Sequence, residues 1–416
     1  MNRPNRWIVA TCLIAATCLL AACGKSSDSG GGSTGIGTGK VASATPPASG
    51  CGSYEAPTVK DPDGVVAALP KALKDRYAGY PYTVRKSAWS DWKPKHGPPY
   101  KVGVQWAQLS TDFQVQVSQR LVKELKKNPD ISDVTFQSTG SNLDVPQQLQ
   151  QTQALIRSEP DIIILEELQP GAFEPLVEAA GKRGIPVIVP VDSLNSKYAV
   201  NVNYNIWNGP AAAASVVVRQ MGGKGNMLMA HAIPGTGADT AAFDAYDKIL
   251  KNCPNIKRAG EVYGNFVVST AKSETLKFLA THPEQIDGAL QTAVMAPGII
   301  DAFKQTGRPV PIVQDVTMMK ASAAYWLQNR DEYKGAGMGF AVADFAQDVA
   351  AVAGRMLAGD GVTMTDILGD APVVTDANLD EWADPSWTER TPGVALGPKD
   401  GYLTPADLNA FFNAGE

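Results

Sequence analysis

The sequence predicts an α/β protein of two similar doubly wound parallel-sheet lobes, joined by a hinge with a ligand cleft between them. Hydrophobic residues make up 44% of the 416 residues and charged residues 19%, which is the composition of a folded chain of two to three domains. From Tyr100 onward, apolar strand-like runs alternate with helical stretches of about 10–15 residues, the pattern of βαβ units. The strand-like runs fall into two sets of four with similar spacing, and they begin near Val102, Val134, Ile162 and Val187, then Met227, Gly260, Ala289 and Val310.

The first 22 residues have the features of a secretory signal. Arg3 and Arg6 precede an apolar run from Trp7 to Ala22, which is shorter than the ~20 residues that a membrane-spanning helix needs. The run ends in Leu20-Ala21-Ala22-Cys23, which resembles a bacterial lipobox. We therefore expect residues 1–22 to be a lipoprotein signal peptide and Cys23 to be diacylated. The alternative is an ordinary signal peptide with an incidental cysteine.

Residues 23–50 are predicted to be a tether, because residues 24–50 hold eight Gly and six Ser. A flexible coil of this length reaches ~30 Å. Two acyl chains on Cys23 anchor a protein stably, so the bilayer is an expected partner and the body is expected on the periplasmic or extracellular side. Cys12 and Cys18 leave with the signal, so only Cys51 and Cys253 remain unmodified. An oxidising compartment favours a disulfide between them, and two free thiols are the alternative.

The rest of the chain divides by pattern. Residues 51–99 form an irregular N-terminal extension, in which Val65–Tyr77 is predicted as one amphipathic helix. Lobe 1 spans 100–203, completed by part of 341–375, and lobe 2 spans 204–340. Val202–Asn208 is the expected hinge, and 376–416 is a C-terminal tail with a short capped helix after Thr404-Pro405. Helices are predicted over Phe113–Lys127, Val145–Arg157, Glu174–Arg183, Pro210–Met221, Thr240–Leu250, Thr270–Ala280, Gly298–Gln305 and Ala343–Leu357.

Ligands bind beyond the carboxyl ends of the strands in open parallel sheets, so the residues that follow each strand are the candidates for ligand contact. These residues are carboxylates, amides, hydroxyls and one aromatic, without Arg or Lys. Carboxylates accept strong hydrogen bonds from ligand hydroxyls, and a ring face packs against the C–H side of a sugar. The alternative for each residue is a purely structural role, such as capping a helix or forming a turn. The candidates are Gln108, Ser110, Phe113, Glu166, Asp192, Asp239, Thr292 and Asp315.

Composition and motifs exclude several function classes. The formal net charge of −5 offers no basic surface for nucleic acid. Five Cys and three His are too scattered for a zinc module, so no metal and no cofactor are expected. The one Gly-x-Ser-x-Gly match, Gly31–Gly35, lies in the Gly/Ser-rich tether and not at a strand-to-helix turn, and the chain has no His-Glu-x-x-His motif, so we expect no enzyme activity. A hydrolase with residues assembled only in space, using His231, is the remote alternative.

Three segments carry a family resemblance: Val102–Asn128, Pro160–Leu165, and Gly184–Val189 with Asp192 downstream. They resemble bacterial type I periplasmic binding proteins of the ribose- and galactose-binding kind, over about residues 100–370. The resemblance implies ligand contacts from Ser110 and Phe113, from Asp192 and Asp315, and, as in some members, from Asp239. The chain departs from the family at three places. Thr240, Ala242 and Phe243 occupy the segment where the family usually has an Arg. Thr292-Ala293 replaces the usual Asn-Asp pair, and Ala341 lies where an Asn or Gln is usual.

The resemblance implies a lipid-anchored substrate-binding protein of an ABC sugar importer, whose partners are a small ligand and a membrane permease. We expect a monomer whose lobes close on a neutral polyhydroxy ligand such as a sugar or polyol. The missing contacts weigh against a common hexose or ribose, and a nucleoside or cationic ligand stays open. The second alternative is a sensor subunit that presents its ligand to a membrane receptor.

Overall fold

The computed structural model describes residues 49–413. The predicted signal peptide, Cys23 and nearly all of the tether lie outside this range. The described body contains two six-stranded sheets and a short two-stranded sheet, β11 (Gly361–Val362) with β14 (Phe412–Asn413). Within residues 49–413, no helix has the length and apolar character needed to span a membrane.

Lobe 1 is built on an all-parallel sheet with the strand order β12-β5-β4-β3-β1-β2. Its central strands β3 and β4 are apolar and buried at every position, as expected for a parallel sheet covered on both faces. The strands are β1 (Tyr100–Trp106), β2 (Ile131–Ser138), β3 (Ile162–Leu165), β4 (Val187–Pro190), β5 (Ala199–Asn203) and β12 (Asp366–Leu368); the helices are α2 (Asp112–Leu125), α3 (Val145–Arg157), α4 (Pro170–Lys182) and α10 (Val342–Leu357).

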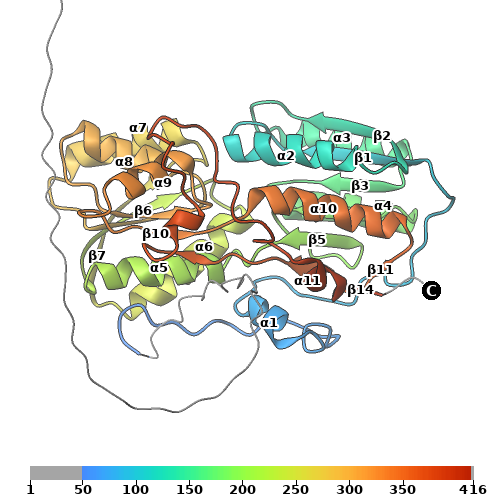
Figure 1. Ribbon diagram of the computed structural model, residues 1–416, viewed down its shortest axis with the longest axis horizontal. Helices are drawn as coiled ribbons and strands as arrows, with labels where there is room; N and C mark the ends of the chain where they lie inside the picture. Colours follow the sequence, from blue (N-terminus) through green and yellow to red (C-terminus); the bar gives the residue numbers. More distant parts are fainter. Residues whose placement is uncertain (1–48, 414–416) are drawn as a thin grey trace, which may run out of the picture. The chain divides into compact units, whose positions relative to one another are not determined.

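Lobe 2 repeats this plan with the strand order β13-β10-β9-β8-β6-β7, in which only β13 is antiparallel. The two matching sheets confirm the predicted fold class (Figure 1). The strands are β6 (Lys224–His231), β7 (Asn255–Tyr263), β8 (Gly288–Gln291), β9 (Ile312–Val316), β10 (Ala336–Met338) and β13 (Val373–Val374); the helices are α5 (Asn208–Gln220), α6 (Gly237–Lys251), α7 (Val268–Thr281), α8 (Ala296–Gln305) and α9 (Lys320–Gln328).

Local sequence explains where several helices begin. Asp144 caps α3 by accepting a 2.9 Å hydrogen bond from the backbone N–H of Gln147, and Pro146 fits the first turn. Thr111 caps α2 in the same way through Gln114. The short helix predicted after Thr404-Pro405 is α11 (Pro405–Asn409), which has a complete capping box.

Between β5 and β13 the chain passes between the lobes three times. The first crossing lies at residues 204–207, because Val202 and Asn203 still belong to β5 of lobe 1. The predicted hinge at Val202–Asn208 therefore begins two residues too early. After β10 the chain returns to lobe 1, where α10 packs on α2 and β12 extends the sheet (Figure 1). It then enters lobe 2 again to form β13.

The single helix predicted over Val65–Tyr77 is wrong. Only α1 (Lys71–Lys74) and a 3-10 turn at Asp75–Tyr77 form there. Pro70 explains the difference, because its ring disfavours helical backbone at the preceding residue and it has no N–H to continue a helix from upstream. The extension is otherwise irregular, as the sequence predicts.

Candidate functional site

A cavity of about 60 Å³ lies where the carboxyl ends of the two sheets face each other. This volume is far below the roughly 300–1,000 Å³ of sites for drug-sized ligands, so the cavity suits a small molecule. Its lining comes from both lobes and from the first crossing. The lining residues are Thr111, Phe113, Gln114, Glu166, Leu168, Val191, Asp192, Tyr204, Thr236, Ala238, Phe266, Ala293, Val294 and Thr317.

The lobe 1 wall carries two buried carboxyl groups. Glu166 follows β3, and its Oε2 accepts a 2.8 Å hydrogen bond from the backbone N–H of Ala107. Asp192 follows β4, and its Oδ1 accepts hydrogen bonds from the Tyr82 hydroxyl at 2.6 Å and from the Ser193 N–H at 2.8 Å. Two acceptor groups with fixed orientation therefore face the cavity from neighbouring strands.

Burial is the main cause of the shifted pKa values in this wall. It raises the pKa of Glu166 to about 8, against the lowering effect of the Ala107 hydrogen bond. It raises the pKa of Asp192 to about 6, and the bonds from Tyr82, Ser193 and the Gly237 backbone limit that rise. Near neutral pH, Glu166 is therefore largely protonated while Asp192 is largely charged.

The lobe 2 wall is less polar. Thr236 and Thr317 contribute hydroxyl-bearing side chains, while Phe266, Ala293 and Val294 are apolar. Phe113 on the other wall is a second aromatic residue, and its ring packs 5.9 Å from that of Phe340. With Tyr204 from the first crossing, three aromatic side chains and several hydroxyl and carboxyl groups thus surround one small space.

Four of the lining residues have left-handed backbone, with φ of 62–76° at Val191, Phe266, Ala293 and Thr317. Each comes shortly after a strand, respectively β4, β7, β8 and β9. Such backbone is unfavourable for branched and bulky residues and is characteristic of functional sites. The strained turns set which side chains reach the cavity.

The structure brings three of the eight predicted site residues, Phe113, Glu166 and Asp192, to the cavity wall. Gln108 is buried but does not line the cavity, and Ser110 donates a hydrogen bond to Gln114. The remaining three belong to lobe 2 and make hydrogen bonds within that lobe. They are Asp239, Thr292 and Asp315.

The two lobe 2 carboxylates stabilise local structure. Asp239 accepts hydrogen bonds from the Ala232 N–H at 2.7 Å and the Thr292 hydroxyl at 3.1 Å, and it contacts Nδ1 of His231 at 2.9 Å. Asp315 accepts from the Ser322 hydroxyl at 2.6 Å and the Met319 N–H at 3.2 Å, at the start of α9. Neither residue lines the cavity as the structure describes it.

Comparison with known proteins shows the family of this chain. A family model described as "Periplasmic binding protein domain" matches residues 102–360. The chain belongs to this family of periplasmic binding proteins, which bind solutes and are not enzymes. A curated relative, the xylitol-binding protein of Mycolicibacterium smegmatis, is 28% identical over 176 residues, which cover 42% of this chain and half the length of the relative.

Solved structures share the fold of this periplasmic binding protein. An ABC transporter solute-binding protein from Thermobispora bispora matches with a TM-score of 0.63 at 19% identity, covering 68% of this chain and 87% of the other. An ABC transporter solute-binding protein from Agrobacterium vitis, with bound allitol, matches with a TM-score of 0.59 at 18% identity, covering 68% and 97%.

Sequence reasoning missed several lining residues of this periplasmic binding protein. Thr236 and Thr317 lie within a few residues of the predicted Asp239 and Asp315, but the threonines line the cavity instead, Thr317 from a left-handed backbone position. Tyr82 was missed entirely, because it lies 110 residues from the Asp192 that it contacts. Its only signal in the sequence is its place among the aromatic residues of the extension.

Proposed function

We propose that this protein is an extracytoplasmic solute-binding protein that captures a small neutral polyhydroxy compound, a sugar or polyol, and delivers it to an ABC importer. The cavity carries the proposal, because it combines two buried carboxyl groups, hydroxyl groups and three aromatic side chains. Among the described residues that line it there is no Arg or Lys, so anionic ligands have no cationic partner.

The protonation of the cavity favours a neutral ligand over a cation. With a pKa of about 8, Glu166 is mostly neutral at pH 7 and both donates and accepts hydrogen bonds. Only one full negative charge, on Asp192, then faces the ligand from this wall. A polyhydroxy compound uses such a mixed set of donors and acceptors. A cation is attracted less strongly, because the neutral Glu166 carries no negative charge.

Two observations favour a polyol over a common aldopyranose. Thr240, Ala242 and Phe243 occupy the segment where the family usually has an Arg, and Thr292-Ala293 replaces the usual Asn-Asp pair. One relative is named for xylitol binding, and one structure of similar fold holds allitol; both compounds are polyols. Fewer fixed polar contacts fit a flexible, linear ligand.

Binding is expected to couple to lobe closure. A ligand in the cavity contacts both walls only when the lobes are together, so it shifts an open–closed equilibrium toward the closed form. The closed form is the one that docks on the permease. We also propose that acylated Cys23 holds the monomeric body at the outer face of the cell membrane.

A thermal-shift screen tests the ligand class, followed by calorimetric titration of any hit. The screen compares polyols from glycerol to hexitols, aldoses, nucleosides, amines and sugar phosphates on the purified protein. A ligand at 100 times its Kd should stabilise the protein by about 2.7 kcal/mol. We expect hits among neutral polyols or sugars, and hits confined to phosphates, carboxylates or amines would contradict the proposal.

A further inference from the structure

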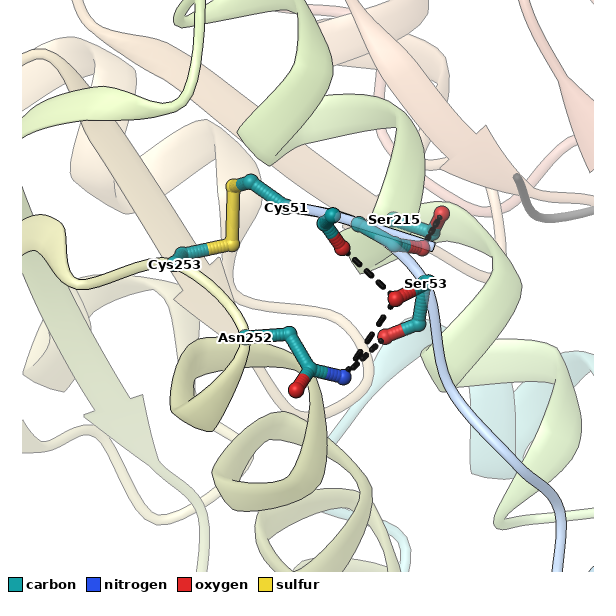
Figure 2. Close-up of a disulfide and its surroundings, with 7 residues drawn as sticks. Cys51, Ser53, Ser215, Asn252 and Cys253 are labelled. Carbon is teal, nitrogen blue, oxygen red and sulfur yellow. Dashed lines mark hydrogen bonds between the residues drawn. A yellow bond between two sulfur atoms is a disulfide. The ribbon is translucent and has the colours of Figure 1, made fainter. Parts of the chain in front are cut away.

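Residues 51–99, here called the strap, are fixed to lobe 2 at their first residues. Cys51 forms a disulfide with Cys253, just after α6 (Figure 2). Asn252 donates a 2.9 Å hydrogen bond to the carbonyl of Ser53, and the Ser215 hydroxyl of α5 donates to the carbonyl of Gly52. A covalent bond and neighbouring hydrogen bonds therefore hold this end of the strap in place.

The strap then passes the first crossing between the lobes. The Tyr54 hydroxyl donates to Oδ1 of Asn208 at 3.1 Å, and the Tyr54 ring packs edge-on against Trp207 with centroids 5.7 Å apart. The Asn205 side chain donates to the carbonyls of Arg76 and Ala78, both at 2.8 Å. The strap is thus bonded to the connection about which the lobes are expected to move.

The second half of the strap is fixed to lobe 1. The Tyr80 hydroxyl makes hydrogen bonds with Ser193 at 2.6 Å and with Oδ1 of Asp366 at 2.8 Å. The Trp89 indole donates to the carbonyl of Tyr198 at 2.9 Å. Between these two anchors, Tyr82 donates its 2.6 Å hydrogen bond to Asp192 at the cavity wall.

The Tyr82 contact lies where both lobes and the strap meet. Gly237, the first residue of α6 in lobe 2, packs so closely that an ideal Cβ on it would lie 2.7 Å from Oδ1 and 2.9 Å from Oδ2 of Asp192. The Tyr82 hydroxyl is among the atoms that this Cβ would meet. The helix N-terminus and the tyrosine hydroxyl therefore approach the same carboxylate from different parts of the chain.

We propose that the strap is a working part of the binding site and that Tyr82 is a positioning residue, which holds the Asp192 carboxylate in the orientation that accepts a ligand hydroxyl. The Tyr82 and Ser193 bonds both end on Oδ1, so together they fix the plane of the carboxylate. This inference rests on the proposed function, because it concerns how the cavity holds its polyhydroxy ligand.

The proposal also predicts an effect on protonation, because a donor to the carboxylate stabilises its charged form. The titratable groups that face Asp192 are Tyr82 from the strap, Glu166 and Glu167 after β3, and Tyr204 after β5. Burial favours the protonated form of Asp192, and the hydrogen bonds from the Tyr82 hydroxyl, Ser193 and Gly237 oppose it. Without that hydroxyl the pKa of Asp192 should rise, and binding should need a higher pH.

The experiment compares Tyr82→Phe with Tyr54→Phe. Each variant removes one hydroxyl from the strap, but only Tyr82 contacts Asp192. Calorimetric titration from pH 5.5 to 8.5 should show about tenfold weaker binding of the best polyol near pH 6.5 for Tyr82→Phe, with a smaller loss at pH 8.5. Tyr54→Phe should keep the wild-type affinity and pH profile. The comparison is repeated in a Glu166→Gln background, which removes the titration of Glu166.

A double-mutant cycle shows whether Tyr82 acts through Asp192. In an Asp192→Ala background, Tyr82→Phe should cause no further loss of affinity. An equal loss in both backgrounds, or a wild-type affinity and pH profile in Tyr82→Phe, would overturn the proposal.

Carbon-13 NMR titration of the ligand-free protein gives an independent answer: Tyr82→Phe should raise the pKa of Asp192. If the screen finds no polyol or sugar, the proposed function fails, and an unchanged Asp192 pKa would separately refute the role of Tyr82.

Discussion

Asp192 of lobe 1 and Gly237 of lobe 2 approach so closely that any side chain on Gly237 would overlap the carboxylate. An ideal Cβ on Gly237 would lie 2.7 Å from Oδ1 of Asp192, inside the distance at which real Cβ atoms are found. The two residues are 45 positions apart and join the two walls beside the cavity. The close approach of the lobes in this structure therefore depends on glycine at this position.

Gly237→Ala should weaken ligand binding by about 10- to 100-fold, because the methyl group prevents the lobes from reaching this closed arrangement. The melting temperature of the ligand-free protein should change little, since each lobe folds around its own sheet. Gly171→Ala is the matched control, because a Cβ at that position of α4 would meet no atom within 4 Å. Calorimetry on both variants decides the matter, and wild-type affinity in Gly237→Ala would show that closure does not need this contact.

The ligand-free protein should be more heat-stable at pH 5.5 than at pH 8. Burial raises the pKa of Glu166 from 4.5 to about 8, and those of Asp315 and Asp348 from 3.8 to about 7. The folded protein therefore binds more protons than the unfolded chain between about pH 4 and 8, and raising the pH through this range lowers the free energy of unfolding. Thermal melts across this range should show the decline, with a shallower slope in Glu166→Gln. A melting temperature that rises with pH would contradict the assignment.

Removing the disulfide should destabilise the protein. Cys51 and Cys253 close a loop over a sequence separation of 202 residues, so the Cys51→Ser, Cys253→Ser double variant should lose about 2–5 kcal/mol of unfolding free energy. Denaturant unfolding measures this loss. Thiol labelling of the unfolded, unreduced wild-type protein should detect no free cysteine, and two labelled thiols would show that the bond does not form in the cell.

Membrane attachment should depend on Cys23. The motif Leu20–Cys23 predicts that the mature protein partitions into the detergent phase and that Cys23→Ser either releases it or leaves the precursor uncut. Fractionation of cells that produce each form makes the comparison. Equal membrane attachment of the Cys23→Ser variant would refute lipidation at this residue.

Local signals explain how much of the fold was predictable. Helix α3 has the predicted bounds, Val145–Arg157, because its apolar period, its Asp144 cap and Pro146 agree. Strands β12 and β13 were missed, because three and two residues are too few to show a period. The apolar spacing over Val65–Tyr77 suits a helix, but Pro70 interrupts it by disfavouring helical backbone at the residue before it.

The candidate site was less predictable than the fold. The rule that ligands bind after strand ends leads to Glu166, Asp192 and Phe113, which line the cavity. It does not say which of several neighbouring residues points inward, and the left-handed turn at Thr317 settles this for lobe 2. Nor does it reach Tyr82, which comes to Asp192 through tertiary packing of a distant segment.

The central claim is that Asp192 binds ligand hydroxyls in a cavity between two lobes, and calorimetry of Asp192→Ala against the polyol identified in the screen tests it most directly. We predict that binding weakens by about 2–4 kcal/mol, or roughly 30- to 1,000-fold in Kd, and that the free protein stays folded with a somewhat lower melting temperature, because Tyr82 and the Ser193 N–H lose their acceptor. Asp315→Ala is the comparison: it should lower the melting temperature, because Ser322 and the Met319 N–H lose their acceptor, and affect affinity less. Wild-type affinity in a folded Asp192→Ala variant would contradict the account.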